Sequence, residues 1–276
     1  MTRALRTSLA LVVTLLATLT TVLAVAPAQA QTAAYPTLGL PPAGANDWSC
    51  RPTADRPLPA VIVHGTFGDQ KSLLDNLSLA LKSDGYCVYS LDYGNRGTGR
   101  IQRSARQLRR FVDRVLASTG AAKVEMVGHS QGGMMPRYYI KHLGGRRHVE
   151  DLVGLAPSNH GTHVNDAFGS GPLCRACDQQ RAGSRFLTRL NNPDETPGPV
   201  DYTQVETEYD EVVVPYTSAF LDPGPHSVNI LLQDRCPADH VDHLFIPMDQ
   251  QAITWVLDAF DRPGPADPAA PIGCLG

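Results

Sequence analysis

Short apolar runs of strand length alternate with segments of helical spacing from residue 60 onward. The runs are rich in β-branched or aromatic residues and cover 60–63, 86–91, 124–127, 149–155, 205–209 and 228–232. Residues 103–116 carry apolar side chains at spacings of three and four, which is typical of an amphipathic helix. Parallel strands need a crossover of about a dozen residues, usually a helix. The alternation therefore predicts an α/β fold with a mainly parallel sheet flanked by helices.

The stretch from residue 159 to residue 199 departs from this alternation. It carries Asn159-His160-Gly161, Gly169-Ser170-Gly171-Pro172 and a closely spaced cysteine pair, which are typical of irregular loops. A long connection of this kind inside a compact domain is usually functional. We expect residues 159–199 to form a short lid-like excursion over the sheet.

The first thirty residues have the pattern of a secretory signal peptide. Arg3 and Arg6 precede a long apolar run, and Ala28-Gln29-Ala30 follows it with the small residues of a cleavage site. Cleavage after Ala30 would leave residues 31–276 as one α/β domain, and an uncleaved membrane anchor is the alternative. We therefore expect a secreted, extracellular protein.

The charge balance of the chain is slightly acidic. It has 24 Lys and Arg against 27 Asp and Glu, which gives a formal net charge of −3. Loss of the leader would also remove its two arginines and make the charge more negative. An acidic chain is poorly suited to nucleic acid, so no such partner is expected. No stretch after the leader is long and apolar enough to span a bilayer, so stable membrane insertion is not expected either.

Six cysteines follow the leader, an even number that predicts three disulfides in an oxidising compartment. One is expected to tie the N-terminal arm to a strand, one to tie the tail to the loop before the last helix, and one to close within the excursion. These pairs are Cys50–Cys87, Cys236–Cys274 and Cys174–Cys177. The last pair could instead be half of a zinc site, although no second Cys-x-x-Cys completes it.

The pattern that carries chemistry is Gly128-His129-Ser130-Gln131-Gly132. It follows the run at 124–127 and precedes the helix-compatible segment 134–143, which is the strand-turn-helix context of a nucleophile elbow. Glycines two residues either side of the serine allow a turn too tight for a Cβ atom. We predict that Ser130 is the nucleophile of an α/β-hydrolase fold, the alternative being an ordinary Gly-rich turn.

A serine that attacks an ester carbonyl creates an oxyanion, which needs hydrogen-bond donors already in place. The amide of Gln131, directly after the nucleophile, is one expected donor. The run at 60–63 leads into His64-Gly65-Thr66, so the amide of Thr66, together with its hydroxyl, is the expected second donor. His64 is expected to be structural or to shape the hole.

In this fold the acid and then the base follow the nucleophile along the chain. Asp210, after the run at 205–209, is the expected acid, with Glu208 and Glu211 as alternatives. The base is expected on the loop 233–243, ahead of a closing helix at 247–260. That loop contains both His240 and His243, and the pattern alone leaves the choice between them open.

These motifs resemble the secreted class 2 lipases and the fungal lipase B type. The resemblance is carried by His64-Gly65-Thr66, Gly128-His129-Ser130-Gln131-Gly132, Tyr209-Asp210-Glu211-Val212-Val213-Val214-Pro215, and His243 followed by Gln250. It implies a triad of Ser130, Asp210 and His243, with Thr66 and Gln131 as the oxyanion hole, and its spacing into the last helix favours His243 over His240. The cysteines at 174 and 177 have no counterpart in that pattern.

The resemblance also implies a substrate, a lipid ester cleaved through an acyl-enzyme at an oil-water interface by a triacylglycerol lipase. Apolar residues near the expected chemistry agree with this and are Val213, Val214, Leu244, Phe245, Ile246 and, in the excursion, Phe168, Leu173, Phe186, Leu187 and Leu190. The alternatives are a short-chain esterase or polyester depolymerase, a secreted acyltransferase, and a catalytically silent protein on the same fold.

The expected chemistry needs no metal and no organic cofactor, because a triad and an oxyanion hole supply every group that acyl transfer requires. A calcium or zinc site on His160, His163 and Asp166 is the alternative, against which a hydrogen-bonded loop is favoured.

Overall fold

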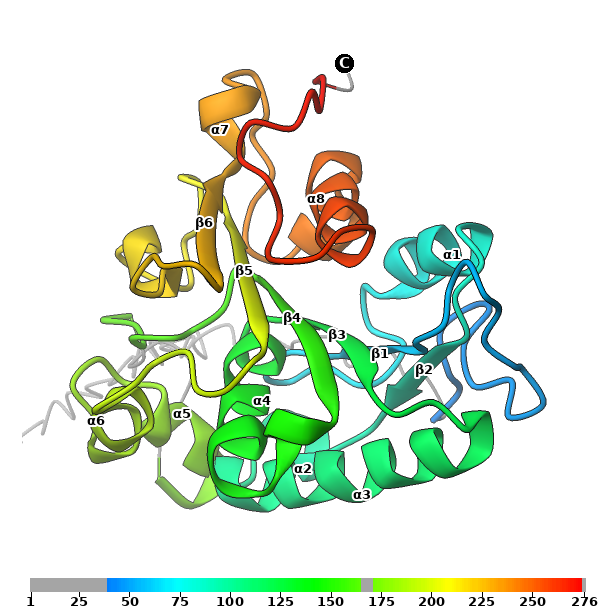
Figure 1. The fold of residues 1–276 in the computed structure, drawn as a ribbon. Helices are drawn as coiled ribbons and strands as arrows, with labels where there is room; N and C mark the ends of the chain where they lie inside the picture. The colour runs from blue at the N-terminus through cyan, green and yellow to red at the C-terminus, as the bar shows by residue number, and fades with distance from the viewer. Residues whose placement is uncertain (1–38, 165–170, 275–276) are drawn as a thin grey trace, which may run out of the picture. The chain divides into compact units, whose positions relative to one another are not determined.

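A computed structural model describes residues 39–164 and 171–274 (Figure 1). Its centre is a wholly parallel six-stranded sheet in the order β2-β1-β3-β4-β5-β6. The strands are β1 (Ala60–Val63), β2 (Val88–Leu91), β3 (Val124–His129), β4 (Val149–Leu155), β5 (Asp201–Glu206) and β6 (Ser227–Leu231). The expected parallel α/β architecture is confirmed.

Helices connect the strands. They are α1 (Asp75–Ser83), α2 (Gly94–Gly97), α3 (Ile101–Thr119), α4 (Gln131–His142), α5 (Arg175–Gln179), α6 (Arg185–Asn191), α7 (Leu232–Arg235) and α8 (Gln250–Phe260). Short 3-10 turns are η1 (Gly145–Arg147), η3 (Gly171–Leu173), η4 (Tyr216–Ala219) and η5 (Ile246–Met248). No helix in the described ranges is long and apolar enough to cross a bilayer.

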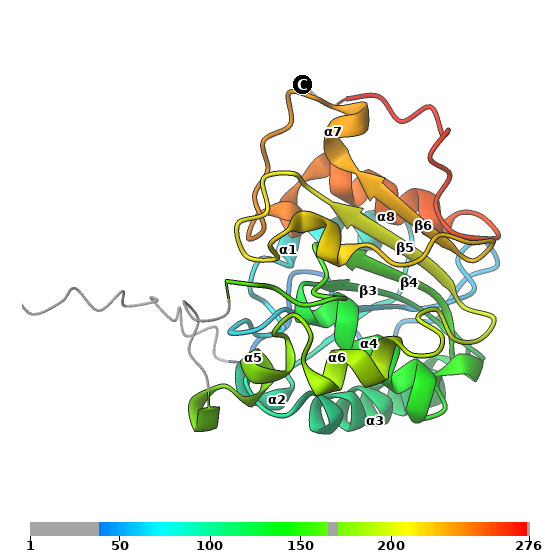
Figure 2. The same ribbon diagram turned by 90° about the vertical axis from the view of Figure 1, so that its left-hand side faces the viewer.

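The helices cover both faces of the sheet, as Figures 1 and 2 show, with α3, α4 and α6 on one face and α1 and α8 on the other. Successive side chains of a strand point to opposite faces of the sheet, so each strand contributes apolar residues to both cores. In β1, Val61 and Val63 join the core beneath α3 and α4, whereas Ala60 and Ile62 join the core beneath α1 and α8. The sheet is therefore buried on both faces, which explains why its strands have nearly continuous apolar runs.

The boundaries of β5 differ from the sequence expectation of 205–209. The strand begins at Asp201, and Tyr202 and Thr203 pair with β4 and β6 although this part of the chain is too polar to read as a strand. It ends at Glu206, because the amide of Asp210 donates to the carbonyl of Thr207 and turns the chain. The acid candidate thus lies on a tight turn after β5.

Smaller differences occur at other ends. β2 begins at Val88 instead of 86, and β6 spans Ser227–Leu231 instead of 228–232. The closing helix begins at Gln250 instead of 247, because Asp249 caps it by accepting from the amide of Ala252 at 2.7 Å. The expected amphipathic helix is present as α3, and the helix expected after the elbow is present as α4. The first and last residues of both helices differ by a few positions from the expected bounds.

The excursion predicted at 159–199 is partly a packed element. Phe186, Leu187 and Leu190 on α6 are buried in the core that α4 and the sheet share. The Nζ of Lys141 on α4 donates to the carbonyl oxygens of Leu190, Asn192 and Asp194 and so fixes the end of α6. The α6 end of the excursion is therefore held on the domain, while Asp166 and Phe168 lie outside the described residues, as does the predicted leader.

All three predicted disulfides are present. They are Cys50–Cys87, Cys174–Cys177 and Cys236–Cys274. The first pins the N-terminal arm beside β2 and the third pins the C-terminal tail to the end of α7. The sulfur atoms of Cys174 and Cys177 are bonded to each other, so the alternative of a zinc half-site at this pair is wrong.

Candidate active site

Ser130 occupies the turn between β3 and α4. Its φ of 55° and ψ of −123° lie in a region that side chains rarely adopt, and the elbow is held by the bond from its amide to the carbonyl of Leu155 at 2.8 Å. A Cβ on Gly128 would lie 1.9 Å from the carbonyl oxygen of Gly132, and one on Gly132 would lie 2.3 Å from that of Val63. Both glycines are thus required for the reason that the sequence pattern suggested.

Replacement of Gly132 by alanine is expected to strain the elbow, because the atoms its Cβ would meet belong to the backbone at the end of β1 and cannot move aside. The free energy of unfolding should fall by about 1–3 kcal/mol or more. Urea denaturation followed by circular dichroism measures this. Gly224→Ala is the matched control, since a Cβ there meets nothing within 4 Å, and an equal loss in both variants would contradict the strain argument.

Asp210 and His243 form a buried pair. The Nδ1 of His243 donates to Oδ2 of Asp210 at 2.7 Å, and the two side chains are 3% and 0% exposed. The amides of Val212 and Val213 donate to Oδ1 of Asp210 at 2.8 and 2.7 Å. A carboxylate held in this way fixes the ring orientation of the histidine and leaves its Nε2 to face the serine.

The neighbouring candidates lie elsewhere. His240 is exposed, and its ring packs against Tyr209 with centroids 4.6 Å apart. Glu208 and Glu211 are also exposed, although Oε2 of Glu211 accepts from the amide of His243 at 3.5 Å. The geometry thus places Asp210 and His243 together and leaves the alternatives at the surface.

His129, the residue before the serine, orders the loop of His243. Its Nε2 donates to the carbonyl oxygen of His243 at 2.8 Å, and the two rings lie 4.9 Å apart. Burial lowers the pKa of His129 to about 3, so its ring is neutral and acts as a fixed donor. Nothing in the sequence pattern distinguished this histidine from the other residues of the elbow.

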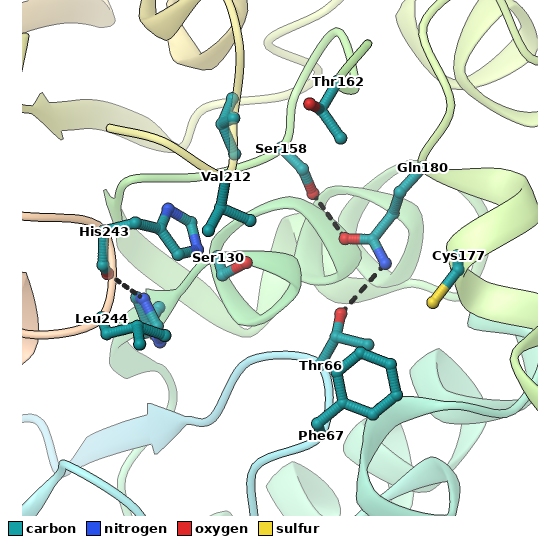
Figure 3. Close-up of a pocket in the computed structure, with 12 residues that line it drawn as sticks. Thr66, Phe67, Ser130, Ser158, Thr162, Cys177, Gln180, Val212, His243 and Leu244 are labelled. Atoms are coloured by element: carbon teal, nitrogen blue, oxygen red, sulfur yellow. Dashed lines mark hydrogen bonds between the residues drawn. The ribbon is translucent and has the colours of Figure 1, made fainter. Parts of the chain in front are cut away.

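Figure 3 shows the imidazole of His243 beside the side chain of Ser130. Among the described residues no hydrogen bond joins the serine hydroxyl to this ring. Such bonds are often long in ligand-free sites and close when substrate binds. A serine hydroxyl, an imidazole and a buried carboxylate are the three groups that a serine triad would use.

The loop after β1 places Thr66 next to the elbow (Figure 3). Neither the amide of Thr66 nor that of Gln131, the first residue of α4, donates to another described residue. Arg96 holds the loop, because its carbonyl accepts from the amide of Phe67 at 2.7 Å and its Nη1 bonds to Asp69 at 2.9 Å. Two backbone donors are therefore kept free beside Ser130, as an oxyanion hole requires.

The hydroxyl of Thr66 lies in a small network of side-chain amides. Its oxygen accepts from Nε2 of Gln131 at 2.7 Å and from Nε2 of Gln180 at 3.0 Å. Oε1 of Gln180 in turn accepts from the hydroxyl of Ser158 at 2.8 Å. A hydroxyl has two acceptor positions, and with both filled its hydrogen is left to donate elsewhere.

Sequence reasoning missed Gln180 and Ser158. They come from the excursion and from the loop after β4, whose paths over the sheet have no periodic signal. The pair of glutamines Gln179-Gln180 beside the cysteines is the one local hint, and its first member bonds instead to the amide of Ile101.

His64 is part of the framework, in agreement with the expectation that it is structural. Its ring stacks on Tyr93 at 4.2 Å, and its Nδ1 donates to the carbonyl of Gly65 at 2.7 Å. Burial lowers the pKa of His64 to about 4, so the ring stays neutral at ordinary pH.

The cavity above Ser130 has mixed walls. Its lining combines polar and apolar side chains, among them Ser158, Thr162, Gln180, Phe67, Val212, Val213 and Leu244. Of the apolar residues expected near the chemistry, Val213 and Leu244 line this cavity. Ile246, after the base, belongs instead to the core. Phe186, Leu187 and Leu190 of the excursion do so as well, which corrects the expectation that these residues line the cleft.

Large apolar side chains are exposed at the cavity, on the loop that carries His243 and in the excursion. Phe67 is 41% exposed on the loop after β1, and Leu244 and Phe245 are 48% and 52% exposed beside His243. Leu173, in η3 of the excursion, is 86% exposed. Exposed apolar groups near a site on several loops are typical of a surface that contacts an apolar partner.

The described residues of the alternative metal site form hydrogen bonds with other groups. Nε2 of His160 bonds to Glu195 at 2.7 Å, and the amide of His163 bonds to the carbonyl of Val214 at 3.1 Å, while Asp166 lies outside the described residues. Among the residues that the structure describes, no group of three His, Cys, Asp or Glu side chains is arranged to hold a metal ion.

Comparison with known proteins assigns this chain to a family. The family model described as Lipase (class 2) matches residues 57–243. The triacylglycerol lipase of Pseudarthrobacter phenanthrenivorans is 38% identical over 92 residues, which are 29% of this chain and 27% of that protein. The triacylglycerol lipase of Vibrio cholerae serotype O1 is 35% identical over 113 residues, or 40% of this chain and 34% of that protein. The chain therefore spans well under half the length of these relatives.

Solved structures share the fold. Aspergillus fumigatus lipase B superposes with a TM-score of 0.70 at 20% identity, covering 83% of this chain and 57% of that one. Bacillus licheniformis lipase BlEst2 in mature form gives 0.57 at 18% identity, covering 76% of this chain and 91% of that one. At such identities the likeness establishes the architecture, which is the α/β-hydrolase fold.

Proposed function

The chain belongs to the class 2 lipase family, and on that premise we propose that it is a secreted serine hydrolase that cleaves the carboxylic esters of lipids, triacylglycerols above all. The observation that carries the proposal is the strained Ser130, flanked by the buried Asp210–His243 pair on one side and by the free amides of Thr66 and Gln131 on the other. The predicted leader and the three disulfides support secretion.

In the first half of the proposed reaction, Nε2 of His243 takes the hydroxyl proton of Ser130 as its Oγ attacks the ester carbonyl carbon. Asp210 stabilises the imidazolium that forms. The carbonyl oxygen becomes an oxyanion and accepts hydrogen bonds from the amides of Thr66 and Gln131 and from the Thr66 hydroxyl. Collapse of this intermediate breaks the carbon-oxygen bond, and His243 donates the proton to the leaving alcohol.

The second half hydrolyses the acyl-enzyme. His243 removes a proton from water, the hydroxide attacks the acyl carbonyl in the same oxyanion hole, and Ser130 leaves with the proton returned by His243. The fatty acid is released and the enzyme regains its starting state. Every proton transfer in the scheme uses groups of this chain or water.

The exposed apolar side chains at the mouth support a lipid substrate. Phe67, Leu244 and Phe245 come from two loops on either side of the site and would contact acyl chains as these approach Ser130. Each methylene removed from water contributes about 0.8 kcal/mol, so acyl length should increase the specificity constant. This supports a lipase over a short-chain esterase that shares the same triad.

The test is a substrate profile of the purified protein. We expect kcat/KM for octanoyl or longer p-nitrophenyl esters to exceed that for the acetyl ester by about tenfold or more, and emulsified triacylglycerol to be hydrolysed. Ser130→Ala should abolish both activities. Peak activity on the acetyl ester with none on the emulsion would leave a short-chain esterase, and hydrolysis that persists in Ser130→Ala would refute the serine mechanism.

A matched pair of variants separates the apolar mouth from the chemistry. Leu244→Ser with Phe245→Ser should lower the rate on emulsions and leave acetyl ester hydrolysis largely intact. Leu79→Ser is the control, because Leu79 is similarly exposed, at 47%, but lies on α1. An equal loss on both substrates would point to damage at His243 instead.

A further inference from the structure

A second carboxyl lies beside the acid of the triad. Glu206, the last residue of β5, is fully buried, and its Oε1 accepts from the amide of Thr207 at 2.8 Å. Its Oε2 is buried as well and accepts no hydrogen bond from a described residue. Asp210 lies four residues further on, on the tight turn that follows β5, and its carboxyl acts on that of Glu206. Two ionised carboxylates cannot hydrogen-bond to each other, so this pair is satisfied only if it shares a proton.

The acceptor positions of Asp210 show where that proton goes. A carboxylate oxygen accepts about two hydrogen bonds. Oδ1 has two, from the amides of Val212 and Val213, and Oδ2 has one, from Nδ1 of His243. One position remains on Oδ2, and a protonated Glu206 fills it.

The surroundings decide which carboxyl carries the proton. Both side chains are buried, but Asp210 accepts hydrogen bonds from three donors, whereas Glu206 accepts from one. Burial, and then the charge of Asp210, raise the pKa of Glu206 well above its usual range. Glu206 is therefore the neutral member of the pair.

Other titratable groups around the pair do not replace this proton. His243 donates to Asp210 from the loop before η5, and His129 at the end of β3 is a neutral donor to the His243 carbonyl. Glu211 is exposed and contacts the amide of His243. Among the described residues, Asp210 is the one charged group that acts on Glu206.

We infer that Glu206 is a positioning residue of the triad, a protonated carboxylic acid that donates a hydrogen bond to Asp210 and so limits the negative charge that His243 experiences. The inference rests on the proposed function and deepens it. Without the donor, the full charge of Asp210 would favour the imidazolium form of the resting enzyme. The base would then become available only at a higher pH.

The experiment compares Glu206→Gln, which keeps a donor, with Glu206→Met, which has a similar size and none. In Glu206→Met the acidic limb of the kcat/KM profile on a p-nitrophenyl ester should move up by about one pH unit. In Glu206→Gln it should stay in place. Glu208→Gln is the control for loss of a nearby carboxylate at the surface. Coincident limbs in Glu206→Met and the wild type would overturn the inference.

A second readout does not depend on turnover. The low-field proton resonance of the His243–Asp210 hydrogen bond, recorded in ligand-free protein, should titrate at higher pH in Glu206→Met. If Glu206→Met does not fold, the same resonance in the wild type and in Glu206→Gln still tests the inference. The resonance should shift at alkaline pH in the wild type, as Glu206 loses its proton, and not in Glu206→Gln; identical behaviour would refute the shared proton. Absence of ester hydrolysis in the wild type would refute the proposed function alone.

Discussion

Replacement of His243 by alanine is expected to lower kcat on any ester by about 10⁴-fold or more, because it removes the proposed base that takes the proton of Ser130. Among the residues that the structure describes, His243 alone both bonds to a buried carboxylate and lines the cavity above the elbow. The measurement is kcat and KM on a soluble p-nitrophenyl ester. KM should change little, since the loss concerns the transition state.

His240→Ala is the matched control for this variant. His240 lies three residues earlier on the same loop but packs at the surface against Tyr209, so most of the activity should remain. If His240→Ala were inactive and His243→Ala active, the base would be His240 and the pair with Asp210 would be structural. Thermal denaturation of both variants checks that each is folded.

Local patterns sufficed for much of the fold and for the core of the site. Apolar runs between helical segments predicted the parallel sheet, because a sheet covered on both faces needs apolar residues on both sides of each strand. The elbow was readable because a turn this tight demands glycine at positions 128 and 132. Asp210 could be placed after a strand because the order of the triad is fixed in this fold.

What the sequence did not reveal depends on contacts between distant segments. Gln180 reaches Thr66 from a segment 114 residues away, and no periodicity encodes that approach. Glu206 looked like part of a strand, and its role emerges only once the turn to Asp210 is seen. The apolar residues of α6 were assigned to the cleft because burial against α4 cannot be distinguished from exposure by composition alone.

Replacement of Thr66 by valine is expected to lower kcat by about 10²- to 10³-fold, the usual effect of removing one oxyanion donor. Valine has nearly the shape of threonine and keeps the backbone amide, so only the hydroxyl is lost. That hydroxyl already accepts from Gln131 and Gln180, so its hydrogen is left to donate elsewhere, and we expect it to donate to the oxyanion. Thr66→Ser retains the hydroxyl and should retain most of the activity.

The Gln180 side of the network gives an independent check on how the Thr66 hydroxyl is oriented. In Gln180→Leu the oxygen of Thr66 loses one of its two donors, so its hydrogen is free to turn away from the cavity. We expect a smaller fall in kcat than for Thr66→Val, and in the double variant little loss beyond Thr66→Val, because Gln180 acts through that hydroxyl. Additive losses in the double variant would mean that Gln180 contacts the substrate directly and that the Thr66 hydroxyl needs no help to point at the oxyanion.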